Sequence, residues 1–130
     1  MTNERTKLQL DLFEKALLKL KDALSQNETE YVRDSVIQRF EFTFEMAWKS
    51  LRRILLDRGE NVPDSAYEAL QAAFKARLIK DADLWRDIRD NRNSTSHTYQ
   101  EIVAIKVAAF IRGTAASAFD DLLASLKPLA

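Results

Sequence analysis

The sequence contains no cysteine, one histidine, two glycines and two prolines among its 130 residues. Without cysteine, the chain can form no disulfide framework and no thiolate zinc site, and it has no thiol nucleophile. The single histidine, His97, excludes a metal site or proton relay that needs two imidazoles from one chain. Two glycines exclude a Walker loop and a dinucleotide fingerprint, and so few turn residues argue against an all-β fold. Chemistry must therefore come from one imidazole, carboxylates, hydroxyls and arginines.

Charge of neither sign is in excess, because 20 lysines and arginines balance 20 aspartates and glutamates. This balance argues against a broadly basic surface for nucleic acid, so any anion site must be local. The N-terminal residues are charged throughout, unlike a signal peptide, and no uninterrupted apolar run approaches the roughly 20 residues of a membrane span. We therefore expect a soluble, cytoplasmic protein with no membrane association, folded as one domain over residues 1–130.

Apolar residues recur with the helical period along the whole chain, beginning with Leu10, Phe13 and Leu17. Thr29 or Asp34 could cap the second helix, and Gly59 follows its end as a C-terminal capping glycine would. Ser65 and Thr98 each precede a glutamate by three residues, the form of a capping box. Short connections favour an all-α, up-and-down bundle of about five helices with a four-helix-bundle-like core. The predicted helices cover about residues 4–26, 29–58, 64–78, 81–92 and 98–127.

The same periodicity predicts which side chains form the core. We expect the inward-facing residues beyond the second helix to be Tyr67, Leu70, Phe74, Leu84, Trp85, Ile88, Ile105, Ala108, Ala115, Phe119, Leu122 and Leu126. Trp48 is also most simply a core residue. The last helix is rich in alanine, which fits ordinary core packing or, alternatively, close approach of a second chain.

Arg92 and His97 flank a polar turn, with Arg92 expected at the end of the fourth helix and His97 just before the fifth. Free N–H groups at a helix N-terminus favour a bound anion, and their field would favour a neutral imidazole able to accept a proton. An arginine can hold two phosphate oxygens at once. The combination suits a phosphodiester, with the imidazole deprotonating a 2′-hydroxyl and Arg92 stabilising the developing charge. A surface histidine beside a helix cap is the alternative.

Two segments carry a resemblance to a known family. Residues 92–99, RNSTSHTY, resemble the Arg-x4-His-x-Tyr motif of HEPN proteins of the HepT type. Residues 38–49, QRFEFTFEMAWK, resemble the second helix of the nucleotidyltransferase substrate-binding-like proteins, a branch of that group. The similarity in helix order and length covers nearly the whole chain.

The resemblance implies a homodimer whose two motifs face a shared cleft, and a partner that is a minimal nucleotidyltransferase (MNT). In such pairs the HEPN member is a toxin that cuts RNA without a metal or cofactor, and the MNT member is its antitoxin. The resemblance assigns phosphate binding to Arg92, acid–base chemistry to His97 and positioning to Asn93. It makes Tyr99 a target for AMP transfer, which would silence the toxin. Arg89 is a further candidate for substrate binding, although neighbouring aspartates offset part of its charge.

Two other functions remain open from the sequence. The chain could be the non-catalytic substrate-binding subunit of a two-component nucleotidyltransferase, or a helical dimerisation module without a nucleotide. Glu41 and Glu45 share one helix face, as paired catalytic carboxylates might, but Glu45 also lies four residues before Lys49, an ordinary surface pair. Lys49, Arg52 and Arg53 form a small basic patch that could meet RNA or a partner, or simply be solvated.

Overall fold

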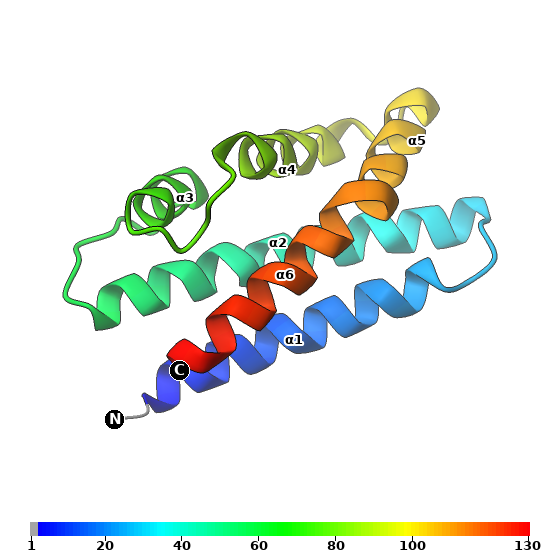
Figure 1. Cartoon of the computed structure of the whole chain (residues 1–130). Helices are drawn as coiled ribbons and strands as arrows, with labels where there is room; N and C mark the ends of the chain where they lie inside the picture. The colour runs from blue at the N-terminus through cyan, green and yellow to red at the C-terminus, as the bar shows by residue number, and fades with distance from the viewer. Residues whose placement is uncertain (1–2) are drawn as a thin grey trace.

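The computed structural model describes residues 3–130, and these fold into a bundle of helices without strands. Helices α1 (Glu4–Leu24) and α2 (Glu30–Asp57) form a long antiparallel hairpin. The short helix α3 (Ala66–Lys75) and helix α4 (Ala82–Ser94) lie over one side of α2, and the C-terminal helices cross α1 and α2 diagonally (Figure 1). The remaining elements are η1 (Thr95–His97), α5 (Glu101–Phe110), η2 (Ile111–Ala115), α6 (Ala116–Leu126) and η3 (Lys127–Leu129). The expectation of an all-α bundle is confirmed.

Side-chain caps fix where the helices begin. The Thr29 hydroxyl accepts a hydrogen bond from the Val32 N–H at 3.1 Å, so Thr29 rather than Asp34 caps α2. Ser65 caps α3 and Asp81 caps α4 in the same way. Gly59 follows the end of α2 with φ of +85°, a left-handed conformation that glycine adopts without steric cost.

The predicted capping box at Thr98 is wrong. The Thr98 hydroxyl donates to the Thr95 carbonyl at 3.0 Å, and α5 begins only at Glu101, after Gln100, whose side chain makes no capping hydrogen bond. The polar segment folds first as the 3₁₀ turn η1, because the hydroxyls of Ser94, Thr95 and Thr98 bond to nearby carbonyls. The last helix is therefore three residues shorter at its start than its sequence pattern suggests.

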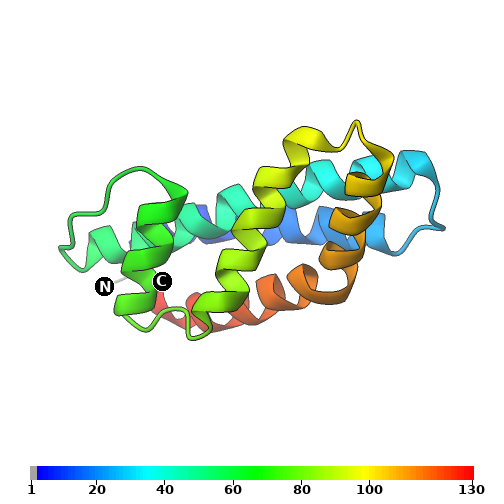
Figure 2. The same ribbon diagram turned by 90° about the horizontal axis from the view of Figure 1, so that it is seen from above.

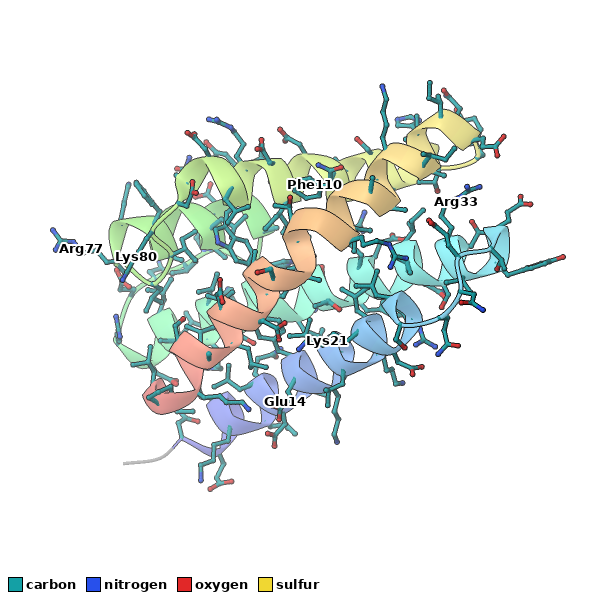
Figure 3. The ribbon with its side chains drawn as sticks, turned by 45° about the vertical axis from the view of Figure 1, so that its right-hand side comes forward. Glu14, Lys21, Arg33, Arg77, Lys80 and Phe110 are labelled. Atoms are coloured by element: carbon teal, nitrogen blue, oxygen red, sulfur yellow. The ribbon has the colours of Figure 1, made fainter. Side chains whose placement is uncertain are left out.

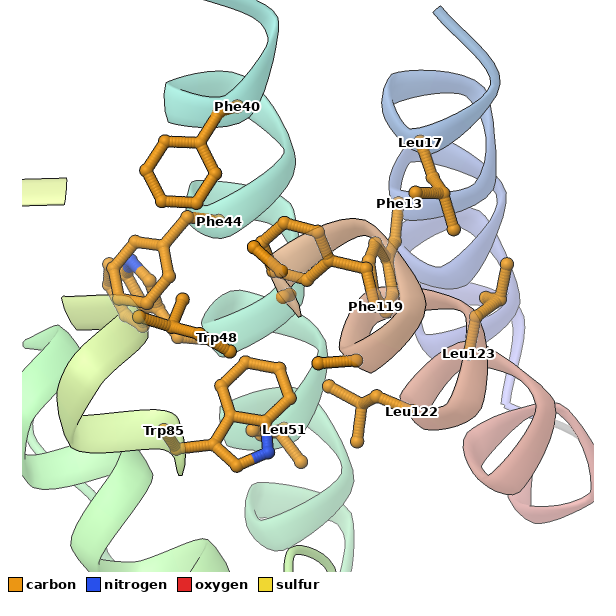
Figure 4. Close-up of a cluster of buried hydrophobic side chains, with 14 of the residues drawn as sticks. Phe13, Leu17, Phe40, Phe44, Trp48, Leu51, Trp85, Phe119, Leu122 and Leu123 are labelled. Carbon is orange, nitrogen blue, oxygen red and sulfur yellow. The ribbon is translucent and has the colours of Figure 1, made fainter. Parts of the chain in front are cut away.

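Phe119 of α6 forms the centre of the core. Its ring centroid lies 6.3 Å from that of Phe13, 6.0 Å from Phe40 and 5.9 Å from Trp85 (Figure 4). These contacts join α1, α2, α4 and α6 at one point. Trp48 and Ile88 are also buried as predicted, whereas Leu84 is only partly buried.

Three aromatic and aliphatic side chains that the pattern places inside are instead half-exposed: Tyr67 at 49%, Phe74 at 47% and Ile105 at 48%. In α3 the buried face consists of Ala69, Leu70 and Ala73, which leaves Tyr67 and Phe74 at its edges. Ile105 is displaced by η2, a π-helical turn in the middle of the last helix. A π turn adds one residue to the register, and one residue is worth about 100° of rotation, enough to carry Ile105 out of the apolar stripe.

The stretch Glu101–Leu129 is one helical run of 29 residues whose most apolar window has a mean hydropathy of 1.6. By length and composition alone it could cross a membrane, although Lys106 and Arg112 interrupt it. In the fold it supplies Phe119 and other core side chains, and 39% of that window is buried. Ion pairs also connect it to the hairpin, because Lys21 lies 2.5 Å from Asp120 and Arg33 lies 3.8 Å from Glu101. Figure 3 labels the two hairpin residues, Lys21 on α1 and Arg33 on α2.

Candidate functional site

The segment that carries Arg92 and His97 links the end of α4 to the start of α5, above the first half of α2 (Figure 2). Arg92 occupies the last turn of α4, where the partial negative charge of the helix C-terminus favours a cation. His97 closes the 3₁₀ turn that follows. The segment thus brings both motif residues to one end of the bundle, as the sequence predicts.

Two partners hold the Arg92 side chain. Its Nη1 donates to the Thr95 hydroxyl at 3.1 Å, while the same hydroxyl donates to the Arg92 carbonyl at 2.7 Å. The Glu41 carboxylate of α2 lies 3.6 Å from the same Nη1. The Arg92 side chain nevertheless keeps 36% of its surface exposed. Arg92 is therefore oriented by its neighbours and still open to an incoming anion.

His97 is exposed, and its ring lies edge-on to that of Tyr99 at a centroid distance of 6.2 Å. The Tyr99 side chain is 80% exposed, and its hydroxyl accepts a long hydrogen bond of 3.4 Å from Gln100. Neither ring belongs to the core, so both are accessible to another molecule. Asn93, one residue after Arg92, is exposed as well.

The expected placement of His97 directly before a helix N-terminus does not occur. Because α5 begins at Glu101, the imidazole belongs to the 3₁₀ turn, and the His97 carbonyl accepts a hydrogen bond from the Gln100 N–H at 3.0 Å. The imidazole therefore does not lie at the free N–H groups of a helix N-terminus. The exposure of His97 in the same short segment as Arg92 is what supports a catalytic role.

A polar groove of about 590 Å³ lies beside Tyr99, between α2 and the motif segment. Its walls include Asp34, Ser35, Gln38, Glu41 and Tyr99. The two carboxylates make this side of the site acidic, in contrast to the guanidinium of Arg92. Within residues 3–130, no group of three or more acidic or histidine side chains is placed to hold a metal ion.

Arg89 points to a different neighbour. Its guanidinium carbon lies 5.0 Å from the centre of the Tyr67 ring in α3, and its carboxylate partner is Asp90 at 3.7 Å. The residue lies one turn before Arg92 on α4, so the two cations follow one another along the helix. Arg89 lines a second groove, between α3 and α4.

Glu41 is a site residue whose role the sequence left undecided. In the sequence it was noticed because it shares a helix face with Glu45. In the structure the two carboxylates contact different residues. Glu45 lies 3.2 Å from Lys49 and accepts a hydrogen bond of 3.0 Å from the Trp48 indole, which favours the structural interpretation of that residue. Of the two glutamates, Glu41 is the one that contacts the motif.

The three cations of the small basic patch on α2 all contact acceptors of the same chain. Arg52 donates to the Val62 carbonyl at 2.9 Å, Arg53 lies 3.1 Å from Asp57, and Lys49 contacts Glu45. These contacts favour the interpretation of the patch as an ordinary, internally neutralised face.

Comparisons with known proteins agree with this geometry. Residues 8–128 match the profile of a family described as nucleotidyltransferase substrate binding protein like. A crystal structure of a Thermus thermophilus protein superposes with a TM-score of 0.80 and 33% identity, covering 88% of this chain and 98% of that one. A Haemophilus influenzae protein named "Probable ribonuclease HepT" is 40% identical over 79 residues, or 58% of this chain. The match spans about half of that relative, 54% of its length.

The fold also matches that of a solved complex. The tri-AMPylated HEPN toxin of Shewanella oneidensis, determined in complex with its MNT antitoxin, superposes with a TM-score of 0.79 at 15% identity. The superposition covers 98% of this chain and 99% of that one. At this identity the likeness establishes a common fold over the full length of both chains.

Proposed function

The chain belongs to the nucleotidyltransferase substrate binding protein like family, a branch of the HEPN superfamily, and from this premise we propose that it is a HepT-type ribonuclease toxin. The observation that carries the proposal is the arrangement of Arg92, held by Thr95 and Glu41 but still open, in the same short segment as the exposed His97. The name of the H. influenzae relative supports it.

The residues fit cleavage of RNA through its own 2′-hydroxyl. The His97 imidazole accepts the 2′-hydroxyl proton, the 2′-oxygen forms a bond to phosphorus, and the bond to the 5′-oxygen breaks. Arg92 binds the phosphate oxygens and stabilises the charge that develops on them, and Asn93 helps to position the phosphate. The departing 5′-oxygen takes a proton, leaving a 2′,3′-cyclic phosphate and a 5′-hydroxyl. The reaction requires no metal or cofactor.

A homodimer supplies the second imidazole that the single histidine cannot. The outer face of α5 supports this part of the proposal, because Ile102 and Ile105 are 64% and 48% exposed directly after the motif. An apolar face beside a site is typical of a protein contact. Two chains joined there would place two His97 rings near one phosphodiester, one accepting a proton and the other donating it.

The ribonuclease proposal is tested by incubating the purified, unmodified dimer with single-stranded RNA in a chelating buffer. We expect cleavage that generates cyclic phosphate ends and that is lost in His97→Ala and in Arg92→Gln. Ser96→Ala, a change in the same turn at an exposed residue, serves as the control and should keep activity. A folded wild-type dimer that cuts no RNA, or a His97→Ala variant as active as the wild type, would contradict the proposal.

The MNT partner enters as the antitoxin, and Tyr99 as its target. The exposed phenol can attack the α-phosphorus of ATP held by the partner, forming a tyrosyl–AMP bond and releasing pyrophosphate and the phenol proton. The added phosphate and base would lie beside His97 and compete with RNA for the same donors. AMP modification of the S. oneidensis toxin supports this assignment. The expected result is a mass gain of one AMP per modified tyrosine, absent in Tyr99→Phe, together with loss of RNA cleavage. An unmodified Tyr99 after incubation with partner and ATP would overturn it.

The family description favours a second candidate, the substrate-binding subunit of a two-component nucleotidyltransferase. In that case the partner would need this chain in order to transfer a nucleotide to another acceptor, and His97→Ala would leave the transfer intact. RNA cleavage by the isolated dimer separates the two. Both functions place the protein in the cytoplasm, where RNA and nucleotides are found.

A further inference from the structure

A second groove lies between α3 and α4, at the end of α4 away from the motif. It has a volume of about 430 Å³, within the range of sites that hold small organic ligands. Its walls are formed mainly by Tyr67, Phe74, Ile79, Trp85, Arg86 and Arg89. The motif residues do not line it.

Three aromatic side chains line the groove. Tyr67 and Phe74 stand half-exposed on α3, beside the buried ring of Trp85 on α4. The Tyr67 hydroxyl accepts a hydrogen bond of 2.7 Å from Gln71, which holds the ring in place. Exposed, oriented aromatic rings are the platforms on which proteins stack the bases of single-stranded nucleic acid.

Cations accompany the rings. The lining includes Lys75, Arg86 and Arg89, and within the described part of the chain it includes no carboxylate. Arg86 pairs with Asp83 at 2.7 Å, a contact between exposed side chains that a phosphate can replace at little cost. The Arg89 guanidinium lies 5.0 Å from the Tyr67 ring centre, and its Nε is shielded from solvent without a hydrogen-bond partner. A groove with apolar walls and a cationic rim is complementary to a ligand that combines a flat base with a phosphate, whereas an apolar protein segment would leave the cations unmatched.

The groove and the motif share one helix. Arg86, Arg89 and Arg92 succeed one another every three residues along α4, which corresponds to about 4.5 Å of helix rise per step. From Arg86 to Arg92 the helix rises by about 9 Å and turns by about 120°, so an extended polymer that contacts both the groove and the guanidinium of Arg92 must cross α4 obliquely. Three aspartates of α4 balance these arginines, so the positive charge that a phosphate would meet is that of the groove lining itself, which includes no carboxylate within the described residues.

We propose that the α3–α4 groove binds an unstacked base, with its adjoining phosphate, of the single-stranded RNA that the Arg92–His97 segment cleaves. Tyr67 and Phe74 stack on the base, and Arg86, Arg89 and Lys75 bind the phosphate. The inference rests on the proposed ribonuclease function for its ligand. It adds a second contact that selects single-stranded over duplex RNA, because a paired base cannot leave its stack to enter the groove.

The test measures binding in the otherwise intact His97→Ala dimer, which leaves the probe uncut. A short fluorescein-labelled single-stranded RNA reports the Kd by anisotropy. Tyr67→Ala should raise the Kd by about 5- to 100-fold, the range seen when one stacking ring is removed. Tyr67→Phe keeps the ring and loses only the hydrogen bond from Gln71, so its Kd should stay much closer to the parental value than that of Tyr67→Ala. Tyr31→Ala, which removes a tyrosine that is 87% exposed at the start of α2, is the matched control and should change nothing.

A second measurement does not depend on the label. In a Trp48→Phe background, Trp85 is the remaining tryptophan, and stacked RNA should quench its fluorescence. The quenching should disappear in Tyr67→Ala while the far-UV circular dichroism stays unchanged. Arg86→Gln should reduce the slope of log Kd against log salt concentration by about one, as expected for the loss of one phosphate contact.

These measurements distinguish failure of the groove proposal from failure of the ribonuclease proposal. If the wild type cleaves RNA but Tyr67→Ala and Phe74→Ala leave the Kd unchanged, the proposal that the groove binds RNA is wrong. The ribonuclease proposal is then unaffected. If RNA binding depends on Tyr67 but the wild type cleaves no RNA, the ribonuclease proposal is wrong and the groove proposal is supported. If Tyr67→Ala instead disrupts the dimer or the complex with the nucleotidyltransferase, without affecting RNA, the groove is a protein interface and the inference is wrong. An equal rise in the Kd for duplex and for single-stranded RNA in Tyr67→Ala would also contradict the inference.

Discussion

The Glu41 carboxylate lies 3.6 Å from the guanidinium of Arg92, so a helix distant in sequence reaches the residue that is proposed to bind phosphate. The carboxylate and an RNA phosphate carry the same charge and compete for the same donors. At about 4 Å, two unit charges in water interact by about 1 kcal/mol, enough to matter for a weak ligand. Glu41 therefore tempers the affinity of the site while it helps to orient Arg92.

We test Glu41→Gln in the His97→Ala background, which leaves the RNA uncut. The change should lower the Kd for single-stranded RNA by about two- to fivefold, because the competing charge is gone. Glu45→Gln makes the same change one turn away, at a carboxylate that contacts Lys49 and Trp48 instead, and should leave the Kd unaltered. The measurement is an anisotropy titration at low salt, where surface charges are least screened. Weaker RNA binding in Glu41→Gln would mean that orientation of Arg92 outweighs competition.

Thr95 is buried and makes two hydrogen bonds with Arg92, which makes it the anchor of the motif segment. Thr95→Val keeps the shape of the side chain but removes both bonds. The misplaced guanidinium should lower kcat/KM for RNA cleavage by about 10- to 100-fold, as small displacements of positioning groups do. Thr95→Ser retains the hydroxyl and should recover most of the activity. If Thr95→Val and Thr95→Ser cleave equally well, the hydroxyl has no such role.

Phe119 contacts aromatic rings from three other helices and has no exposed surface. Phe119→Ala should lower the free energy of unfolding by about 3–5 kcal/mol, since it removes a large side chain from a close-packed core. Phe42→Ala deletes the same atoms at a residue that is 58% exposed, and it should cost less than about 0.5 kcal/mol. Urea titration followed by circular dichroism gives both values. Similar losses in the two variants would contradict the central place of Phe119.

The outer face of α5 is predicted to form the dimer. Ile102→Lys combined with Ile105→Lys places two charges on that face and should convert the dimer to a monomer, measured by light scattering after size exclusion. RNA cleavage should fall with it, because each chain has one imidazole. Leu18→Lys is the matched control, a leucine that is 59% exposed on α1, and it should remain dimeric. A dimer that survives both α5 changes must use another surface.

The sequence predicts most of the helices because capping residues and the apolar period act locally. Ser65 and Asp81 cap the helices that their positions indicate, and Thr29 does so in preference to Asp34. The capping box at Thr98 fails because its hydroxyl bonds to a carbonyl in the preceding turn, an outcome that the spacing alone does not reveal. The sequence also predicts the location of the motif, at the end of α4, from the same local signals.

The partners of the motif residues depend on tertiary contacts and could not be predicted in that way. Glu41 meets Arg92 across 51 positions of sequence, and nothing in the spacing distinguishes it from Glu45. Tyr67 and Phe74 follow the helical period and look like core residues, yet α3 is covered on only one face, where small side chains predominate. The exposure of these rings, and with it the α3–α4 groove, becomes visible only when the helices are assembled.

The π turn at Ile111–Ala115 has a consequence for how this protein can change. It holds one residue more than a regular α-helix would, so the buried side chains Ala104 and Val107 of α5 stay in line with Phe119 of α6. Deletion of one residue there would give a regular α-helix with both buried faces still aligned. An additional residue taken up as regular α-helix would instead turn α5 by about 100° around its axis. An insertion more than ten residues from His97 would thus re-aim the site without altering any residue within it, whereas a deletion at the same place would leave it unchanged.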